Sequence, residues 1–411
     1  MATTSFARYT LQKLGRAFCL AALAAFTFTA TAQTAENNTD APTPAAQSSM
    51  VPVAELSTIP APSVPAKAWM TYDANSGQVI GGLNIEQAVE PASLTKLMTA
   101  YIVFSAIEKN RLALDQEVHV SEKAWKTEGS RMFIDPNSKV TVDELLKGMI
   151  IQSGNDATVA LAEAVAGSES AFVALMNQEA DKMGLKNTYY TNASGLPHDD
   201  HLTTVSDLGI VAVRLVKDFP QYLHYYSEKE YTYNDIRQMN RNRLLWTDST
   251  VDGLKTGHTS TAGYCLVSTA LRDGRRVVSI VVGTESDAAR AEISLKLLNW
   301  SYQNFDTVKL YDAEKPAVEA RVWEGTQETV ALGQPEPIWV TVPRGKLADL
   351  KADAKYTQPL IAPLESGKRA GTVTLELDGK PLREIPLLIL DDVAQAGFFS
   401  RLIDKVKMML Q

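Results

Sequence analysis

The stretch EPASLTKLMTAYIVFSAI, residues 90–107, predicts a helix buried on nearly every side, because its apolar residues leave almost no polar face. Ser93 opens this helix, and Lys96 follows one turn later on the same face. Burying a lysine ammonium costs free energy unless the group is paired or neutral. The pair of Ser93 and Lys96 therefore suggests a catalytic role. The alternative is a helix-capping serine followed by a lysine that reaches the surface.

Two further motifs favour the chemical interpretation. Ser153-Gly154-Asn155 lies in the break between two predicted helices, although on its own it fits a simple Asx turn. Lys255-Thr256-Gly257 lies at the edge of a strand, directly before a hairpin predicted by the turn RDGR at 272–275. A serine hydroxyl, a lysine and further polar groups gathered in one place would suit nucleophilic catalysis.

The order of these three motifs resembles that of the active-site serine penicillin-binding proteins. More narrowly, QSGNDA at 152–157, NRNRLLW at 240–246 and VDGLKTGHTSTAGYCLV at 251–267 resemble the low-molecular-mass D-alanyl-D-alanine carboxypeptidases, from about Ala68 to the C-terminus. The resemblance implies an α+β catalytic domain with an antiparallel sheet, covering helices and a helical lobe. A small all-β domain and a C-terminal amphipathic helix are expected to follow it.

Physical chemistry assigns roles to the first motif. A serine hydroxyl becomes a useful nucleophile when a base takes its proton, and Lys96 can be that base only when neutral. Burial and a nearby cation, expected to be Lys255, would favour the neutral amine. The backbone N–H of Ser93 can help to bind the oxyanion. The resemblance implies that the second donor is the backbone N–H of His258.

The resemblance also implies roles for the remaining polar groups. Ser153 would relay a proton to the leaving amine, and Asn155 would hold the substrate amide. Lys255, Thr256 and Arg241 would bind the terminal carboxylate of the substrate, whereas Arg243 is expected at the surface. The chain after Ser153 has no E-x-x-L-N stretch, so slow rather than efficient hydrolysis of β-lactams is expected.

The implied reaction removes the last D-alanine from a peptidoglycan stem pentapeptide through an acyl-enzyme, and β-lactams are expected to acylate the same serine. One alternative is an endopeptidase that cuts cross-links, although such relatives usually lack a C-terminal β domain. Another is a cell-shape scaffold that only retains the fold. The intact motifs argue against the scaffold.

The N-terminus predicts export. Basic residues precede the apolar run AFCLAALAAFTF, and Ala30-Thr31-Ala32 follows as a cleavage signal, so residues 1–32 are predicted to be a signal peptide. Residues 33–66 are rich in Ala, Thr, Pro and Ser and predict a disordered leader. The catalytic domain is expected at 67–305, the β domain at 306–394 and a terminal helix at 395–411.

The terminal helix places its apolar residues three and four positions apart, opposite a basic face. Periodicity alone does not distinguish a helix docked on its own β domain from one lying in a membrane interface. The basic face, the Phe and Met content and the terminal position favour an anchor on an anionic membrane. With the resemblance, they predict a peripheral protein on the periplasmic face of the inner membrane.

Composition excludes other classes of function. The net charge of −8 and the pI near 5.3 argue against a nucleic-acid partner. Removal of the signal peptide would leave Cys265 as the single cysteine, so no internal disulfide is expected. HDDH at 198–201 matches no zinc pattern and is expected in a solvated loop. The proposed chemistry needs no metal or cofactor.

Overall fold

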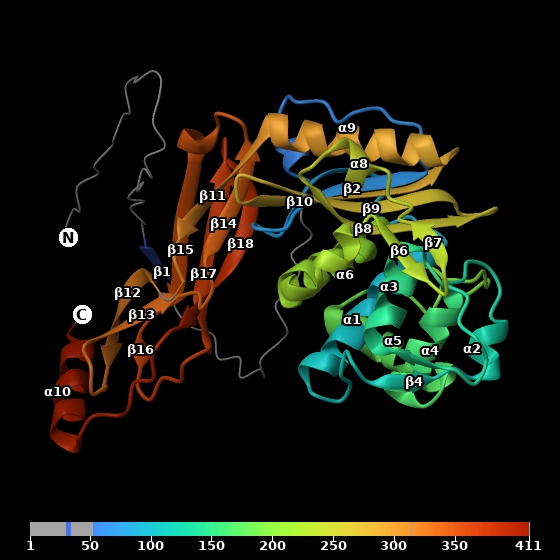
Figure 1. Cartoon of the computed structure of the whole chain (residues 1–411). Coiled ribbons are helices and arrows are strands. Elements are labelled where there is room, and N and C mark those ends of the chain that lie inside the picture. Colours follow the sequence, from blue (N-terminus) through green and yellow to red (C-terminus); the bar gives the residue numbers. More distant parts are fainter. Residues whose placement is uncertain (1–29, 34–51, 314, 411) are drawn as a thin grey trace.

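The structure is a computed structural model that describes residues 30–33, 52–313 and 315–410. It has two parts, a mixed α and β catalytic domain and a β domain that ends in a helix (Figure 1). The catalytic domain contains a five-stranded antiparallel sheet. In order across the sheet, its strands are β3 (Gln78–Leu83), β2 (Ala68–Asp73), β10 (Arg275–Thr284), β9 (Gly263–Arg272) and β8 (Val251–Thr259).

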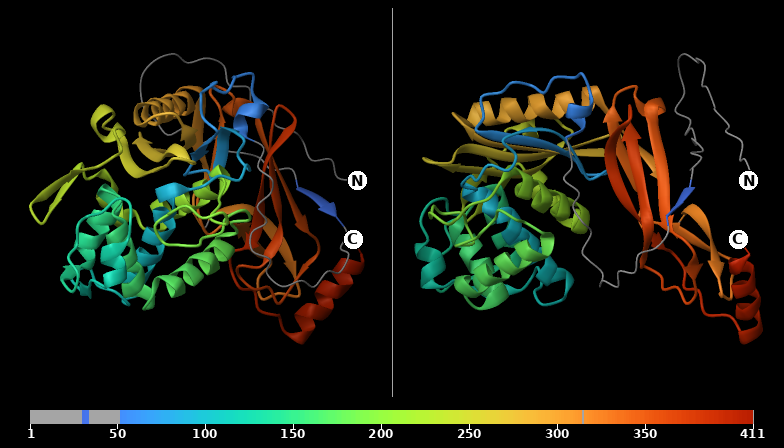
Figure 2. Two further views of the ribbon diagram at one scale, coloured as in Figure 1. Left: turned by 90° about the vertical axis from the view of Figure 1, so that its right-hand side faces the viewer. Right: turned by 180° about the vertical axis from the view of Figure 1, so that it is seen from behind.

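Helices cover both faces of this sheet. The long helix α9 (Asp287–Asn304) lies on one face, and the helical lobe lies on the other (Figures 1 and 2). The main helices on the lobe side are α1 (Lys96–Glu108), α2 (Glu122–Lys126), α3 (Val142–Ile151), α4 (Asn155–Ala166), α5 (Glu169–Met183) and α6 (Val205–Asp218). The expected α+β architecture is confirmed.

Short elements complete the catalytic domain. Five of them are short helical turns: η1 (Val53–Leu56), η2 (Ala92–Thr95), η3 (Pro220–Tyr222), α7 (His224–Ser227) and α8 (Leu244–Thr247). The others form two small two-stranded sheets. Strand β4 (Glu117–His119) pairs with β5 (Lys139–Thr141), and β6 (Glu230–Tyr233) pairs with β7 (Ile236–Met239).

Local sequence signals account for most of these boundaries. The β9–β10 hairpin turns at Asp273 and Gly274, which both have positive φ, as the RDGR signal predicts. Helix α4 ends at Gly167 and α5 at Gly184, each in the left-handed conformation that glycine adopts without strain. Thr141 and Glu144 form a capping box at the start of α3.

The structure differs from the sequence expectations in two places. Ser93 does not open the long helix but lies in η2, and α1 begins at Lys96. The predicted leader is not disordered throughout, because Val53 in η1 is fully buried in a cluster with Ile80 and Trp300. That cluster depends on residues distant in the sequence, so composition alone could not reveal it.

The β domain begins with β11 (Phe305–Tyr311), which pairs with β14 (Ile338–Pro343). A second sheet has seven strands in the order β1 (Ala30–Gln33), β15 (Leu350–Thr357), β17 (Arg369–Leu377), β18 (Lys380–Ile389), β13 (Thr329–Gly333), β12 (Pro316–Trp323) and β16 (Leu360–Ile361). A turn, η4 (Leu347–Asp349), precedes β15. The predicted cleavage site falls in β1, and residues 1–29 lie outside the described residues.

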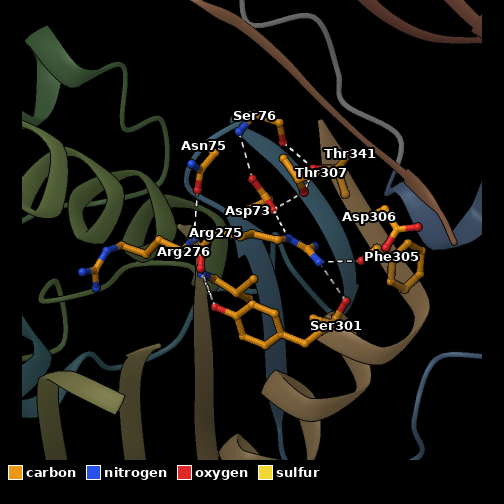
Figure 3. A network of polar contacts seen from close by, with 12 residues as sticks. Asp73, Asn75, Ser76, Arg275, Arg276, Ser301, Phe305, Asp306, Thr307 and Thr341 are labelled. Carbon is orange, nitrogen blue, oxygen red and sulfur yellow. Dashed lines mark hydrogen bonds and ion pairs between the residues drawn. The ribbon is translucent and has the colours of Figure 1, made fainter. Parts of the chain in front are cut away.

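A polar network joins the two domains (Figure 3). The fully buried Asp73 carboxylate accepts hydrogen bonds from Arg275 Nε at 2.7 Å and Thr307 Oγ1 at 2.6 Å. Ser76 Oγ lies 2.6 Å from Thr341 Oγ1 across the same junction. The side chain of Gln78 bonds both the N–H and the carbonyl of Thr341, as a neighbouring strand would. These contacts fix the orientation of the β domain on the catalytic sheet.

The terminal helix α10 (Phe398–Met409) lies at the far end of the β domain (Figures 1 and 2). Asp404 accepts a hydrogen bond from Glu324 N at 2.9 Å, which ties the polar side of the helix to the end of β12. The apolar side is open, with Phe399 79% and Met409 86% exposed. Among the described residues no single helix is long and apolar enough to cross a membrane, although the bent pair α4 and α5 meets that test jointly.

Candidate active site

The turn η2 packs directly against the edge strand β8. A Cβ atom added to Gly257 would lie 3.2 Å from the Pro91 carbonyl and 3.3 Å from the side chains of Ala92 and Leu94. Glycine therefore permits the close approach of the K-T-G strand to the turn that carries Ser93. The first and third motifs, which are far apart in the sequence, thus face each other across a narrow space.

Lys96 is the centre of the polar contacts in this space. Its ammonium nitrogen lies 3.1 Å from Ser93 Oγ, 2.7 Å from Asn155 Oδ1 and 2.6 Å from the Ser194 carbonyl. The side chain is buried inside an otherwise apolar helix. Three short contacts hold the amine in hydrogen-bond reach of the serine hydroxyl, which is the geometry required of a general base.

Burial is the main cause that lowers the pKa of Lys96 to about 7, and the Arg241 guanidinium is the next cause. The carboxylate of Asp156 acts in the opposite direction. The loop 240–243 thus brings Arg241 close to Lys96 as a neighbouring cation, in addition to Lys255, whose own pKa is lowered by the charge of Lys96. A pKa near 7 leaves a substantial fraction of Lys96 neutral at physiological pH.

The second motif lies behind the serine. Ser153 has φ 68° and a buried Oγ that has no hydrogen-bond partner within the described part of the chain. A buried hydroxyl with no partner leaves hydrogen-bonding capacity for a ligand. Asn155 begins α4, where its Oδ1 accepts from Lys96 and its Nδ2 donates to the Glu128 carbonyl at 2.6 Å.

Lys255 lies inside β8 and is buried, and its ammonium donates to the Thr256 carbonyl at 3.0 Å. Burial, followed by the nearby cations Lys96, Arg241 and Arg290, lowers the pKa of Lys255 well below its usual range. Several cations gather at this site, and among the residues that the structure describes no carboxylate pairs with Lys255, so the site favours an anionic ligand. The exposed ring of His258 packs on Tyr264 with 4.0 Å between ring centroids, so its side chain has a neighbour already.

A cavity of about 370 Å³ opens over these groups. Its lining includes Ser93, Ser153, Arg241, Thr256 and His258, together with Ser130, Asn240, Arg243, Gly257, Tyr264, Asp287 and Arg290. Lys96, Asn155 and Lys255 lie behind this surface. Arg243, expected simply at the surface, has an exposed side chain that lines the cavity while it pairs with Asp287 at 2.7 Å.

Several residues at the site carry no motif that identifies them from sequence. The carboxylate of Asp156 accepts the backbone N–H groups of Met132 at 2.9 Å, Phe133 at 2.9 Å and Ile134 at 3.3 Å, and so fixes that loop on α4. Ser194 contributes its carbonyl to Lys96. The only signal for Asp156 is its position next to Asn155, and Ser194 gives none, because any residue has a carbonyl.

The prediction that the HDDH segment is a solvated loop is wrong for one of its two histidines. His198 is exposed, but His201 is buried and lies 2.9 Å from the hydroxyl of Thr95. Burial is the largest cause that lowers the pKa of His201 to about 4. Cys265 is fully buried, and burial raises the pKa of its thiol to about 11. Within the described residues, no group of three or more His, Cys, Asp or Glu side chains could hold a metal ion.

Comparison with known proteins places this geometry in a family. The family described as D-alanyl-D-alanine carboxypeptidase matches residues 55–286. The chain belongs to this family. A second family, described as penicillin-binding protein 5 C-terminal domain, matches residues 305–395. The D-alanyl-D-alanine carboxypeptidase DacC of Escherichia coli K12 is 43% identical over 359 residues, covering 85% of this chain and 90% of DacC.

Solved structures agree with this membership. Penicillin-binding protein 5 from Haemophilus influenzae has a TM-score of 0.78 at 39% identity, covering 82% of this chain and 100% of that chain. Penicillin-binding protein D2 from Listeria monocytogenes, solved in an ampicillin-bound form, has a TM-score of 0.55 at 30% identity and covers 59% of this chain and 100% of that chain. The predicted family, its catalytic fold and its C-terminal β domain are therefore confirmed.

Proposed function

We propose that the chain removes the terminal D-alanine from peptidoglycan stem peptides as a serine-type carboxypeptidase, and that β-lactams acylate the same serine. The observation that carries the proposal is the contact between Lys96 Nζ and Ser93 Oγ at 3.1 Å, in a buried setting that lowers the lysine pKa to about 7. Family membership supplies the class of substrate.

In the proposed acylation step, Ser93 Oγ bonds to the carbonyl carbon of the penultimate D-alanine, and neutral Lys96 takes the hydroxyl proton. The backbone N–H groups of Ser93 and His258 stabilise the oxyanion. The carbon–nitrogen bond then breaks, and the leaving amine takes a proton through Ser153. Water attacks the resulting ester, and Ser93 regains its proton.

The terminal carboxylate of the substrate would be bound by Lys255, Thr256 and Arg241. Thr256 and Arg241 line the cavity, and Lys255 lies behind them. A carboxylate raises the pKa of a nearby lysine, so substrate binding would restore the positive charge that burial and the neighbouring cations disfavour at Lys255. Asn155 would hold the substrate amide while it orients Lys96.

We also propose that the protein is exported and lies on the periplasmic face of the inner membrane. The predicted signal peptide at 1–32 supports export. The exposed apolar side of α10, with the cations Arg401, Lys405 and Lys407 on the same helix, supports binding in an anionic membrane interface.

Intact-protein mass spectrometry tests the enzymatic proposal directly. Incubation with penicillin should add the mass of one β-lactam molecule, and incubation with a pentapeptide ending in D-Ala-D-Ala should release D-alanine. Ser93→Ala should abolish labelling and reduce D-alanine release at least about thousandfold, since only binding and oxyanion groups remain. Labelling that persists at another serine would remove Ser93 from its role.

A further inference from the structure

His201 lies behind the turn that carries the nucleophile, and the contacts around it determine its tautomer. The Thr95 hydroxyl donates its hydrogen to the Ala92 carbonyl at 2.8 Å, so at its 2.9 Å contact with His201 Nε2 it accepts. Nε2 therefore carries the proton. Nδ1 is then the acceptor for the Thr191 hydroxyl at 3.0 Å, for Thr191 N at 3.2 Å and for Asn192 Nδ2 at 3.3 Å. The neutral ring satisfies every one of these contacts, and a second proton on Nδ1 would face donors.

The first group that His201 positions is the carbonyl of Ala92. Ala92 precedes Ser93 and has φ 48°, a conformation that a residue with a Cβ adopts only when its neighbours hold it. The donor from Thr95 binds this carbonyl on one side. The backbone of Gly195 lies so close on another side that an added Cβ would be 1.8 Å from the Ala92 oxygen. The orientation of the Ser93 hydroxyl thus depends on a turn that the Thr95–His201 pair supports.

The second group is the loop that binds Lys96. The Oδ1 of Asn192 accepts the backbone N–H groups of Ser194 at 3.2 Å, Gly195 at 2.7 Å and Leu196 at 3.0 Å, which gives the loop its shape. The Nδ2 of the same amide donates to the Leu196 carbonyl at 2.9 Å and also lies 3.3 Å from His201 Nδ1. Because the Ser194 carbonyl then accepts from Lys96 Nζ at 2.6 Å, the ring reaches the base through Asn192.

We propose that His201 is a positioning residue for acyl transfer, which fixes the Ser93 turn through Thr95 and the Lys96-binding carbonyl of Ser194 through Asn192. His201 does not line the cavity of about 370 Å³, so it does not touch the substrate. Its loss should slow the chemical step and leave the first binding of substrate or β-lactam unchanged. The inference rests on the acyl-transfer function proposed above.

The test compares His201→Leu with His201→Gln, in which the amide nitrogen can replace the Nε2 donor to Thr95. Penicillin acylation is measured by stopped flow and separated into the initial binding constant and the first-order acylation rate. His201→Leu should lower the rate about 10- to 100-fold, the scale expected when reacting groups are misplaced by about 1 Å. Initial binding should change less than about twofold, and His201→Gln should recover most of the rate. His198→Gln, an exposed histidine of the same segment, is the matched control.

The pH profile supplies a readout that general loss of stability would not move. A carbonyl acceptor favours the ammonium form of lysine, so weakening the Ser194 contact should shift the rise of acylation to lower pH in His201→Leu. Folded His201→Leu with the native rate and profile would overturn the inference, and so would equal losses in His201→Leu and His201→Gln. If His201→Leu does not fold, Thr95→Val decides the matter, because it removes the same link without changing the shape of the side chain. If Thr95→Val then acylates at the native rate, the positioning role of His201 is contradicted. Failure of the native protein to react at all would instead overturn the proposed function.

Discussion

The ammonium nitrogen of Lys96 lies 3.1 Å from Ser93 Oγ, in a site that lowers the lysine pKa to about 7. A base acts only when deprotonated, so the acylation rate should rise with pH and reach half of its plateau near pH 7. Stopped-flow acylation by a fluorescent penicillin between pH 5 and 9 measures this, with Ser93→Ala as the blank. A rate that does not change over this range would exclude Lys96 as the base.

Arg241→Ala should shift that profile to higher pH, because Arg241 is the charge that lowers the pKa of Lys96 after burial. The variant should also lose discrimination between a substrate with a free terminal carboxylate and the corresponding amide. Losing one charge-assisted contact is worth about 1.5 to 3 kcal/mol, or roughly 10- to 100-fold in kcat/KM.

Arg243→Ala is the matched control, because that exposed arginine pairs with Asp287 and does not perturb Lys96. Its pH at half-maximal rate should equal the native value. If the two arginine variants behave alike, the assignment of Arg241 is wrong.

Asp156→Asn should loosen the loop that follows Arg131. In the native protein the carboxylate accepts hydrogen bonds from the backbone N–H groups of Phe133 and Ile134. The substitution would place the N–H donors of an amide against these two donors. Hydrogen bonds to a charged acceptor contribute about 1.5 to 3 kcal/mol, so chemical denaturation should show a loss on that scale. Hydrogen exchange at Met132–Ile134 should accelerate. The exposed Asp135→Asn should show neither change, and equal effects in the two variants would contradict the role of Asp156.

Asp73→Asn should destabilise the whole protein. The fully buried carboxylate pairs with Arg275 at the domain junction (Figure 3), and removing one member of a buried pair costs about 3 to 5 kcal/mol. Asp306→Asn is the comparison, because Asp306 pairs with Arg344 in an exposed position where such a pair contributes about 1 kcal/mol or less. Denaturant unfolding measures both, and a native unfolding midpoint in Asp73→Asn would show that the junction does not hold the domains.

Deletion of residues 397–411 should give an enzyme that no longer sediments with vesicles containing anionic lipid but keeps its activity on small peptides. Apart from the half-buried Met408, the deleted apolar side chains from Phe398 to Leu410 are exposed, so the catalytic domain should fold without them. The full chain should be released only in part by high salt, because apolar burial persists when charge attraction is screened. Sedimentation of the shortened protein, or loss of its fold, would assign the helix to the β domain instead.

Local patterns in the sequence predicted much of this structure. The turn RDGR predicted the β9–β10 hairpin, because such a signal acts between neighbours in the chain. The glycines that end α4 and α5, Gly167 and Gly184, are local signals of the same kind. The three motifs were found together at one cavity or directly behind it, and their family resemblance was confirmed.

What could not be predicted depends on contacts between distant residues. His201 looks like part of a polar loop until Thr95 and Thr191 surround it. Arg241 lowers the pKa of Lys96 because the fold brings the two side chains together, although Arg241 comes about 145 residues later in the sequence. Val53 lies within the segment 33–66, whose composition predicts disorder, yet it is buried in a cluster with Trp300, which is distant in the sequence.

The left-handed backbone of Ala92 puts stability and reactivity in opposition at one position. An L-residue in this conformation costs about 1 to 2 kcal/mol that glycine does not, so Ala92→Gly would relieve the turn. The same change would widen the range of conformations open to Ser93 before it reacts. A more heat-resistant but slower protein is the expected result of Ala92→Gly.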